Sequence, residues 1–471
     1  MGEPQNDPIG LEGAEERTER LLREVLQRAI RYLDSLGERP VSPSPQALQN
    51  LGHLEEAFPE RGRDALETLG LLDEYGAPAT MATAGSRYFG FVNGAVLPAA
   101  LAASWMSSVW DQNAGLPVMS PVADRLHEVV RGWLLDLLGL PEAGELCLVS
   151  GASMANTTAL IAARDRLLAQ AGWDVQAHGL FGAPPLQVVV GERVHSTLLK
   201  SLGMAGLGRQ RVITVPADEQ GRMRADALPD LEGPVLVCAQ AGEVNTGAFD
   251  PFAEIISWAR RRQAWVHVDG AFGLWALADP GMAHLVEGLR QADSWVTDGH
   301  KLLNLTYDCG ILLVRRGEDL RRSFAATAAY LPPDRGFEAL HHGPQGSQRA
   351  RQIEVWAALR TLGRSGVKAL VRRQCGSAQR LAEGLAEAGL EVLNEVVFNQ
   401  VLVRACKDDQ LTRRLIAAVQ EDATCWCGPT DWDGRPAMRI SVSSWRTDQK
   451  AAQRSLAAIL RCARRTGAIA S

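Results

Sequence analysis

The sequence has no long hydrophobic run and no excess of positive charge. A membrane-spanning helix needs about 20 consecutive apolar residues, and no stretch of this chain provides them. Lysine and arginine number 49 against 55 acidic residues, which gives a formal net charge of −6 and a pI near 5.9. These values do not favour binding to nucleic acid or to an anionic membrane surface. The first ten residues, MGEPQNDPIG, are polar and acidic, so we do not expect them to be a secretory signal.

Cysteine is scarce and scattered. Eight cysteines occur in 471 residues, with one close pair at Cys425 and Cys427. No second pair of cysteines or histidines lies near it at the spacing of a zinc site, so we expect no metal centre. Scattered cysteines are typical of reduced thiols, and we therefore expect a cytoplasmic protein.

The hydrophobic pattern divides the chain into three parts. Residues 1–85 include an amphipathic stretch, residues 15–36, followed by the proline-rich GERPVSPSPQ, which predicts an N-terminal helical arm. In residues 86–362, apolar runs alternate with helical stretches and predict an α/β domain with a mostly parallel sheet. The runs that predict strands are ELCLVS, LQVVVG, RVITV, GPVLVCA, AWVHVD and CGILLVR. Residues 363–471 predict a smaller α+β domain.

Small or polar residues stand next to several of these runs. In α/β sheets, ligands bind beyond the carboxyl ends of the strands, where we expect these residues to converge. They are Gly151, Ala152 and Ser153 after ELCLVS, His195 after LQVVVGERV, Asp269 after AWVHV, and His300 and Lys301 before CGILLVR.

One interpretation of this set is a serine hydrolase. The segment GASMA is close to the G-x-S-x-G nucleophile elbow, with Ser153 as the nucleophile, and Asp269 and His300 follow in the expected chain order. However, Ala155 stands where the motif needs its last glycine, and Lys301 has no role.

The other interpretation is pyridoxal phosphate chemistry, in which every residue has a role. A small-residue loop at a helix N-terminus offers N–H groups and a positive dipole end to a phosphate, and Ser153 adds a hydroxyl. Asp269 can keep the pyridine nitrogen protonated, which makes the ring an electron sink. Ala271 is small enough to lie beneath the ring, His195 can stack on its other face, and Lys301 can form the Schiff base. The order of these residues along the chain favours this interpretation.

Nearly the whole chain resembles the group II pyridoxal-phosphate-dependent amino acid decarboxylases, which include aromatic amino acid and glutamate decarboxylases. The similar segments are GERPVSPS, RYFGFV, LVSGASMANTTAL, VHSTLLKS, NTGAFDP, VHVDGAFG, TDGHKLLN and MRISVSSWRT. The resemblance implies the type I fold of these enzymes, with a seven-stranded, mostly parallel sheet in the large domain. It also implies a homodimer whose sites lie near the subunit interface. In such an enzyme Ala152, Ser153 and His300 help bind the phosphate, and we assign Ser294 to the cofactor site as well.

The resemblance also implies roles in catalysis and substrate binding. The composition of AATAAYLPPDRGFEALHHGPQGS predicts a mobile loop. Tyr330 in this loop matches a tyrosine that protonates the substrate carbon after carbon dioxide leaves, and a loop anchor is the alternative. Arg439 matches an arginine that can meet a carboxylate, and a structural ion pair is the alternative. Asn93 suits a pocket contact or a cap.

Two segments depart from the family pattern. Glu243 and Val244 stand where many members have threonines, and the stretch WDQNAG, residues 110–115, is polar where aromatic-specific enzymes are apolar. The expected activity is therefore decarboxylation of an L-amino acid of unspecified side chain to an amine and carbon dioxide. Transamination or carbon–carbon bond cleavage on the same fold is the alternative.

Overall fold

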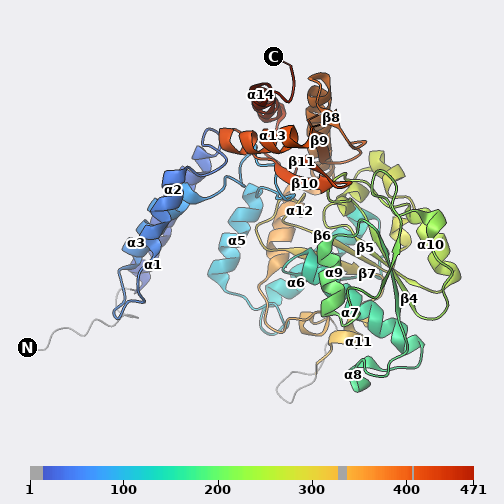
Figure 1. Ribbon diagram of the computed structural model, residues 1–471. Helices are drawn as coiled ribbons and strands as arrows, with labels where there is room; N and C mark the ends of the chain where they lie inside the picture. Colours follow the sequence, from blue (N-terminus) through green and yellow to red (C-terminus); the bar gives the residue numbers. More distant parts are fainter. Residues whose placement is uncertain (1–13, 327–336, 406–407, 471) are drawn as a thin grey trace, which may run out of the picture.

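The computed structural model describes residues 14–326, 337–405 and 408–470, and Figure 1 shows their arrangement. The body of the molecule contains a large sheet flanked by helices. A smaller domain lies above it in this view, and an N-terminal arm lies to its left. Within the described ranges, no helix combines the length and the apolar character needed to cross a bilayer.

The large sheet has seven strands in the order β1-β7-β6-β5-β4-β2-β3. Strands β2 to β6 pair in parallel, and β7 runs antiparallel to both β6 and β1. The strands are β1 (Glu145–Val149), β2 (Gln187–Gly191), β3 (Val212–Val215), β4 (Val235–Gln240), β5 (Trp265–Asp269), β6 (Ser294–Asp298) and β7 (Gly310–Val314). The predicted α/β architecture with a seven-stranded, mostly parallel sheet is thus confirmed. The run SWVTD was not among those predicted as strands, yet it forms β6 near the centre of the sheet.

Both faces of this sheet are covered, which explains why its strands are almost continuously apolar. In β7, Ile311 and Leu313 join the core under α6 (Pro121–Leu138), whereas Leu312 and Val314 pack toward α7 (Ala152–Gln170). The helices α9 (Ser196–Met204) and α11 (Gly317–Phe324) lie beside α7, and α10 (Phe252–Arg261) packs into the core on the α6 side. The domain therefore has three layers.

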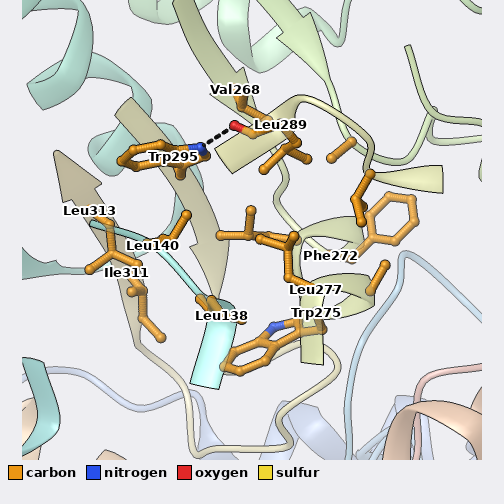
Figure 2. Packing of buried hydrophobic residues seen from close by; sticks show 14 of the residues in the cluster. Leu138, Leu140, Val268, Phe272, Trp275, Leu277, Leu289, Trp295, Ile311 and Leu313 are labelled. Atoms are coloured by element: carbon orange, nitrogen blue, oxygen red, sulfur yellow. Dashed lines mark hydrogen bonds between the residues drawn. The ribbon is translucent and has the colours of Figure 1, made fainter. Parts of the chain in front are cut away.

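The core on the α6 side fixes the central strands. Trp275 and Trp295 are among the largest fully buried side chains, and they pack with the leucines and isoleucine drawn in Figure 2. The indole Nε1 of Trp295 donates to the carbonyl of Leu289 at 2.9 Å, so its one polar atom is bonded within the apolar surroundings. Strand β6 is thereby held in register beside β5 and β7.

The small domain is a four-stranded antiparallel sheet with helices on one side. Its strand order is β10-β11-β9-β8, formed by β8 (Glu391–Val392), β9 (Gln400–Arg404), β10 (Gly428–Trp432) and β11 (Arg435–Ser441). Helices α13 (Asp409–Asp422) and α14 (Gln449–Thr466) pack on it. Cys425 and Cys427 are buried in this core, and all seven cysteines of the described residues are free thiols.

The long helix α12 (Arg351–Glu387) links the two domains. Gly363, where we predicted the small domain to begin, has φ 60° and ψ 179° and kinks the helix. Helical structure resumes beyond the glycine because residues 367–385 bury a second apolar stripe.

The predicted N-terminal helix is confirmed as α1 (Ala14–Ser35), which is followed by α2 (Pro45–Asn50), α3 (Ala65–Leu71) and the one-turn α4 (Ala77–Ala79). Leu22, Leu26 and Ile30 of α1 expose 53%, 46% and 49% of their surface. An apolar groove separates α1 from α5 (Pro98–Trp110), whose Trp105, Met106 and Val109 line its other wall. The arm therefore presents an apolar face that the described chain leaves uncovered.

Candidate active site

A cavity of about 500 Å³ lies at the carboxyl ends of the strands. Ten of the predicted catalytic, cofactor-binding and substrate-binding residues lie in the described part of the chain. Eight of these ten line the cavity. These are Ala152, Ser153, His195, Asp269, Ala271, His300, Lys301 and Arg439. They come from separate stretches of the chain, and the strand ends bring them together as the topology predicts.

Lys301 lies in the turn between β6 and β7. Its Nζ forms an ion pair with the Asp298 carboxylate at 3.0 Å, and the Lys301 side chain is 21% exposed. The turn is fixed by Asn304, whose Nδ2 donates to the carbonyls of Lys301 at 2.8 Å and of Ser443 in the small domain at 2.8 Å. Gln374 of α12 donates to the same Ser443 carbonyl at 2.7 Å. The amine is thus held on a turn that joins both domains.

Asp298, the last residue of β6, was not predicted as a site residue. Its Oδ1 accepts a hydrogen bond from the backbone N–H of Ala152, at the start of α7, at 2.6 Å. The Nε2 of His300 lies 3.7 Å from the same oxygen. Because the Nδ1 of His300 accepts from the N–H of Cys309 at 3.1 Å, the proton of the neutral ring lies on Nε2 and faces Asp298. Burial lowers the pKa of His300, which favours this neutral form.

The first turn of α7 forms one wall of the cavity, and it begins after Gly151. The N–H groups of Ser153 and Met154 belong to this turn and have no acceptor within the helix. Together with the positive end of the helix dipole they favour an anion at this wall. The start of this turn packs directly against the backbone of β7. A side chain at Gly310 would prevent this contact, because its Cβ would lie 2.5 Å from Gly151 Cα.

Asp269 stands at the end of β5 and is 7% exposed. Its Oδ2 accepts from Asn156 Nδ2 at 3.0 Å, and its Oδ1 accepts from the N–H of Ala271 at 3.2 Å. Both contacts are donors to the carboxylate, which suits an ionised side chain. Each oxygen keeps a further lone pair for a ligand in the cavity. Asn156 lies one turn beyond Ser153 on α7, a spacing that places both near the same strand ends.

His195 caps the N-terminus of α9. Its Nδ1 accepts from the N–H of Thr197 at 3.3 Å and lies 2.6 Å from the Thr197 hydroxyl, so the proton of the neutral ring is on Nε2. Burial lowers the pKa of His195, Asp269 opposes this change, and the positive charges of Lys301 and Arg439 reinforce it. The ring facing the cavity is therefore neutral near pH 7.

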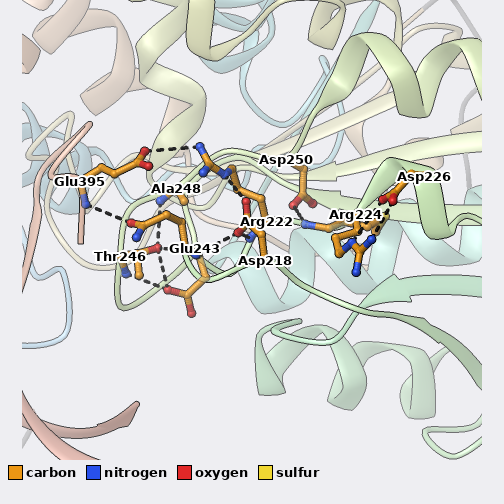
Figure 3. Close-up of polar contacts among 11 residues, drawn as sticks. Asp218, Arg222, Arg224, Asp226, Glu243, Thr246, Ala248, Asp250 and Glu395 are labelled. Carbon is orange, nitrogen blue, oxygen red and sulfur yellow. Dashed lines mark hydrogen bonds and ion pairs between the residues drawn. The ribbon is translucent and has the colours of Figure 1, made fainter. Parts of the chain in front are cut away.

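The loop carrying Glu243 and Val244 explains one departure from the family pattern. Glu243 is 2% exposed and turns back onto its own loop, accepting from the N–H groups of Asn245 at 2.6 Å and Thr246 at 2.7 Å. Figure 3 shows this network beside Arg222 and Asp218. Burial raises the pKa of Glu243, and the hydrogen bonds from its loop oppose this. Val244 consequently lines the cavity, and its carbonyl accepts from Arg439 Nη1 at 3.3 Å.

Two predicted site residues lie elsewhere. Ser294 is fully buried at the amino end of β6, where its hydroxyl contacts Trp265 and His267, so its assignment to the cofactor site does not fit its position. Asn93 does not line the cavity and accepts a hydrogen bond from the Tyr307 hydroxyl at 2.9 Å. Tyr330 lies outside the described residues.

The polar stretch at residues 110–115 also lies away from this cavity. Trp110 faces the groove beside α1, and Asn113 Oδ1 accepts from the N–H groups of Gly115 at 3.1 Å and Gln348 at 3.3 Å. The cavity wall instead contains Phe91, Val92 and Phe272, which the sequence analysis did not single out.

Residues 50–406 match the family profile described as the pyridoxal-dependent decarboxylase conserved domain. The chain belongs to the pyridoxal-dependent decarboxylase family. The L-2,4-diaminobutyrate decarboxylase of Rhizobium meliloti (strain 1021) is 31% identical over 428 residues, which cover 87% of this chain and 82% of that protein. The cysteine sulfinic acid decarboxylase of Rattus norvegicus is 29% identical over 412 residues, which cover 83% and 82%. The crystal structure of Oryza sativa TDC with PLP and tryptamine has the same fold, with a TM-score of 0.86 at 22% identity over 98% of this chain and 99% of that chain.

Membership of this decarboxylase family makes the chain a carboxy-lyase that acts on an amino acid with pyridoxal phosphate (PLP). The predicted type I fold and the predicted cofactor are confirmed. The serine hydrolase alternative fails on geometry as well. Ser153 forms no hydrogen bond with a histidine in the described ranges. The Nδ1 atoms of His195 and His300 accept from the N–H groups of Thr197 and Cys309, so their Nε2 atoms carry the proton and cannot accept one from Ser153.

The residues of the cavity fit PLP. A carboxylate, an amine and a helix N-terminus with N–H groups lacking intrahelical acceptors face one space of about 500 Å³. Asp298 is the exception, because its negative charge lies at the same helix end as the expected phosphate.

Proposed function

We propose that the chain decarboxylates an L-amino acid with Lys301 as the residue that holds PLP covalently. The observation that carries this proposal is the convergence of Lys301, Asp269 and His195 on the one cavity bounded by the first turn of α7. PLP supplies an electron sink for the pair of electrons left on the substrate when carbon dioxide departs. The protein binds and orients the reacting groups.

Asp269 would pair with the protonated ring nitrogen, and the neutral His195 imidazole would stack on the ring opposite Ala271. The N–H groups of Ser153 and Met154, the Ser153 hydroxyl and the Nε2–H of His300 would bind the phosphate. Each is a donor that faces the cavity or its wall, and each carries out its task without rearrangement of the strands.

Arg439 would bind a carboxylate of the substrate. Burial lowers the pKa of this guanidinium, which still carries its charge at neutral pH, and Lys301 and Arg439 are the only lysine or arginine among the described residues that line the cavity. The remaining wall, with Phe91, Val244 and Phe272, is apolar. The relatives act on diaminobutyrate and cysteine sulfinic acid, as their names state.

Tyr330 would deliver the proton to the substrate carbon after decarboxylation. This assignment rests on its distance from Lys301 along the sequence and on the family resemblance. A proton delivered there yields the amine.

We further propose a cytoplasmic homodimer. The apolar groove between α1 and α5 supports the dimer, because Leu22, Leu26, Trp105, Met106 and Val109 present a contiguous apolar surface that a second copy would cover. The free thiols of the described cysteines support a reducing compartment.

The decisive experiment measures colour and gas together. The purified protein should be yellow with PLP, borohydride should trap PLP on Lys301, and a screen of amino acids should identify one that releases carbon dioxide and the matching amine. Lys301→Ala should abolish release at unchanged secondary structure, whereas the exposed Lys200→Ala serves as the matched control. Keto acid or aldehyde without carbon dioxide would contradict decarboxylation, and full activity of Lys301→Ala would contradict the assignment of the lysine.

A further inference from the structure

A chain of buried hydrogen bonds leads away from Asp269, between strands β5 and β6 and helix α7. Asn156 Nδ2 donates to Asp269 at 3.0 Å, and Asn156 Oδ1 lies 2.9 Å from His267 Nε2. His267 Nδ1 lies 2.9 Å from the Ser294 hydroxyl, which accepts from Trp265 Nε1 at 2.9 Å. Trp265 is 3% exposed, and the three side chains between it and Asp269 are fully buried.

The strand geometry explains why these residues meet. Trp265, His267 and Asp269 alternate along β5, so their side chains share the face that packs against α7. Ser294 is the partner of His267 in the register between β5 and β6. Asn156 projects from α7 into the same layer, and Asn156, His267 and Ser294 are fully buried.

This chain of hydrogen bonds can run in two directions, according to which group of each pair donates. In the first, Trp265 donates to Ser294, Ser294 to His267 Nδ1, His267 Nε2 to Asn156 and Asn156 to Asp269, which remains an ionised acceptor. In the second, His267 Nδ1 donates to Ser294, Asn156 Nδ2 donates to His267 Nε2, and Asp269 must be protonated to donate to Asn156. The direction of the chain is therefore tied to the charge of Asp269.

Trp265 selects the first direction. An indole N–H can only donate, so Ser294 must accept from Trp265. If His267 also donated to Ser294, the serine hydroxyl would need another acceptor, and its only contacts in the described structure are Trp265 and His267. A buried hydroxyl without an acceptor is unfavourable. A neutral His267 is required in either direction, and burial lowers its pKa to about 4.

We infer that this chain of hydrogen bonds keeps Asp269 an ionised acceptor aimed at the ring nitrogen of PLP. The residues of the hydrogen-bond chain therefore act as positioning residues for the reaction. They are Trp265, Ser294, His267 and Asn156. The inference rests on the role proposed for Asp269. It also gives Ser294 a function, as an internal member of the chain and without contact to the cofactor.

The test compares two ligands in the apoprotein: PLP and an analogue in which C–H replaces the ring nitrogen. The wild-type protein should bind PLP more tightly, because only PLP offers Asp269 an N–H. Trp265→Phe and Ser294→Ala should each lower this preference by roughly 5- to 20-fold. Each substitution removes a group that fixes which atoms donate along the hydrogen bonds to Asp269. Affinities are measured by equilibrium dialysis, and Ser455→Ala, which removes a buried hydroxyl in the small domain, is the matched control.

A double-mutant cycle with Asp269→Asn separates positioning from packing. In the Asp269→Asn protein, neither Trp265→Phe nor Ser294→Ala should change the preference further. Equal weakening of both ligands, or a further loss of preference in the Asp269→Asn protein, would overturn the inference. A wild-type protein without any preference would instead overturn the role of Asp269 itself. Thermal melting of each variant identifies one that fails to fold, and the other substitution then decides.

Discussion

At the scale of single residues, Asp298 introduces a charge that the sequence analysis did not anticipate. Its carboxylate holds the Ala152 N–H and pairs with Lys301, at the wall where the phosphate of PLP would bind. Two anions close together repel. We predict that Asp298→Asn binds PLP roughly threefold or more tightly at low ionic strength, because an amide keeps the acceptor for Ala152 and removes the charge. Equilibrium dialysis measures the change, with the exposed Asp226→Asn as control. Weaker binding would mean that the ion pair with Lys301 contributes more than the repulsion costs.

His267 makes a residue-scale prediction about pH. Burial lowers its pKa to about 4 from the ordinary 6.5, so the unfolded chain takes up this proton first as the pH falls through that range. The protein should therefore lose stability between these values. His267→Gln should remove up to roughly 3 kcal/mol of that loss. Urea unfolding near pH 7 and near pH 4.5 measures it, with the exposed His53→Gln as control.

Asp250 acts in the opposite sense, because burial raises its pKa to about 6 and the folded protein then binds the proton first. Only the difference between variant and wild type therefore isolates His267. Identical losses of stability in the two proteins would refute the prediction.

Residue types with one dominant chemistry were predictable from the sequence, and their supporting partners were not. Lys301, Asp269 and His195 were named because their chemistry is specific and each stands near a strand end. Ser294 was also assigned to the cofactor site, where it does not lie. An extended strand separates its ends by about 3.3 Å per residue, so Ser294 lies at the far end of β6 from Asp298. Asn156 and His267 carried a usable signal, since each shares a face of its element with Ser153 or Asp269.

At the scale of elements, strand β7 and helix α7 meet through glycine. Gly310 pairs with Val149 on one side and Asp298 on the other, and a Cβ there would lie 2.4 Å from the carbonyl carbon of Gly151. We predict that Gly310→Ala displaces the first turn of α7 and weakens PLP binding at least tenfold, because a contact with backbone cannot be relieved by a rotamer change. Gly132→Ala, in α6 with open space around its Cβ, should instead stabilise the protein by about 0.5 kcal/mol. Unchanged PLP affinity of Gly310→Ala would contradict the close approach.

The elements themselves were predicted more reliably than their pairing. Alternation of apolar runs and helical stretches indicated the α/β class, and GERPVSPSPQ indicated the end of the N-terminal helix. Nothing in the run CGILLVR distinguishes an antiparallel strand from a parallel one, since a strand buried on both faces is apolar in either direction. The direction of β7 follows from the short connection after Lys301, because only an antiparallel neighbour can be reached without a crossover.

At the scale of the whole molecule, the uncovered face of α1 and α5 predicts assembly. Leu22→Asp or Val109→Asp should place a charge in the apolar groove and lower the mass in solution from twice 50.9 kDa to 50.9 kDa. Light scattering after size exclusion measures the mass. Phe181→Asp is the control, because Phe181 is 98% exposed and lies outside the groove. A wild-type protein of 50.9 kDa, or a variant that stays twice that mass, would place the dimer contact elsewhere or exclude it.

The turn built on Asn304 has an evolutionary consequence. Its contacts with Lys301, Leu302 and Ser443 all end on backbone carbonyls, and Trp445 returns a backbone N–H to Asn304 Oδ1 at 2.6 Å. Main-chain groups are the same whatever side chains accompany them. Side chains around this turn can therefore change during evolution while the position of the Lys301 amine stays the same.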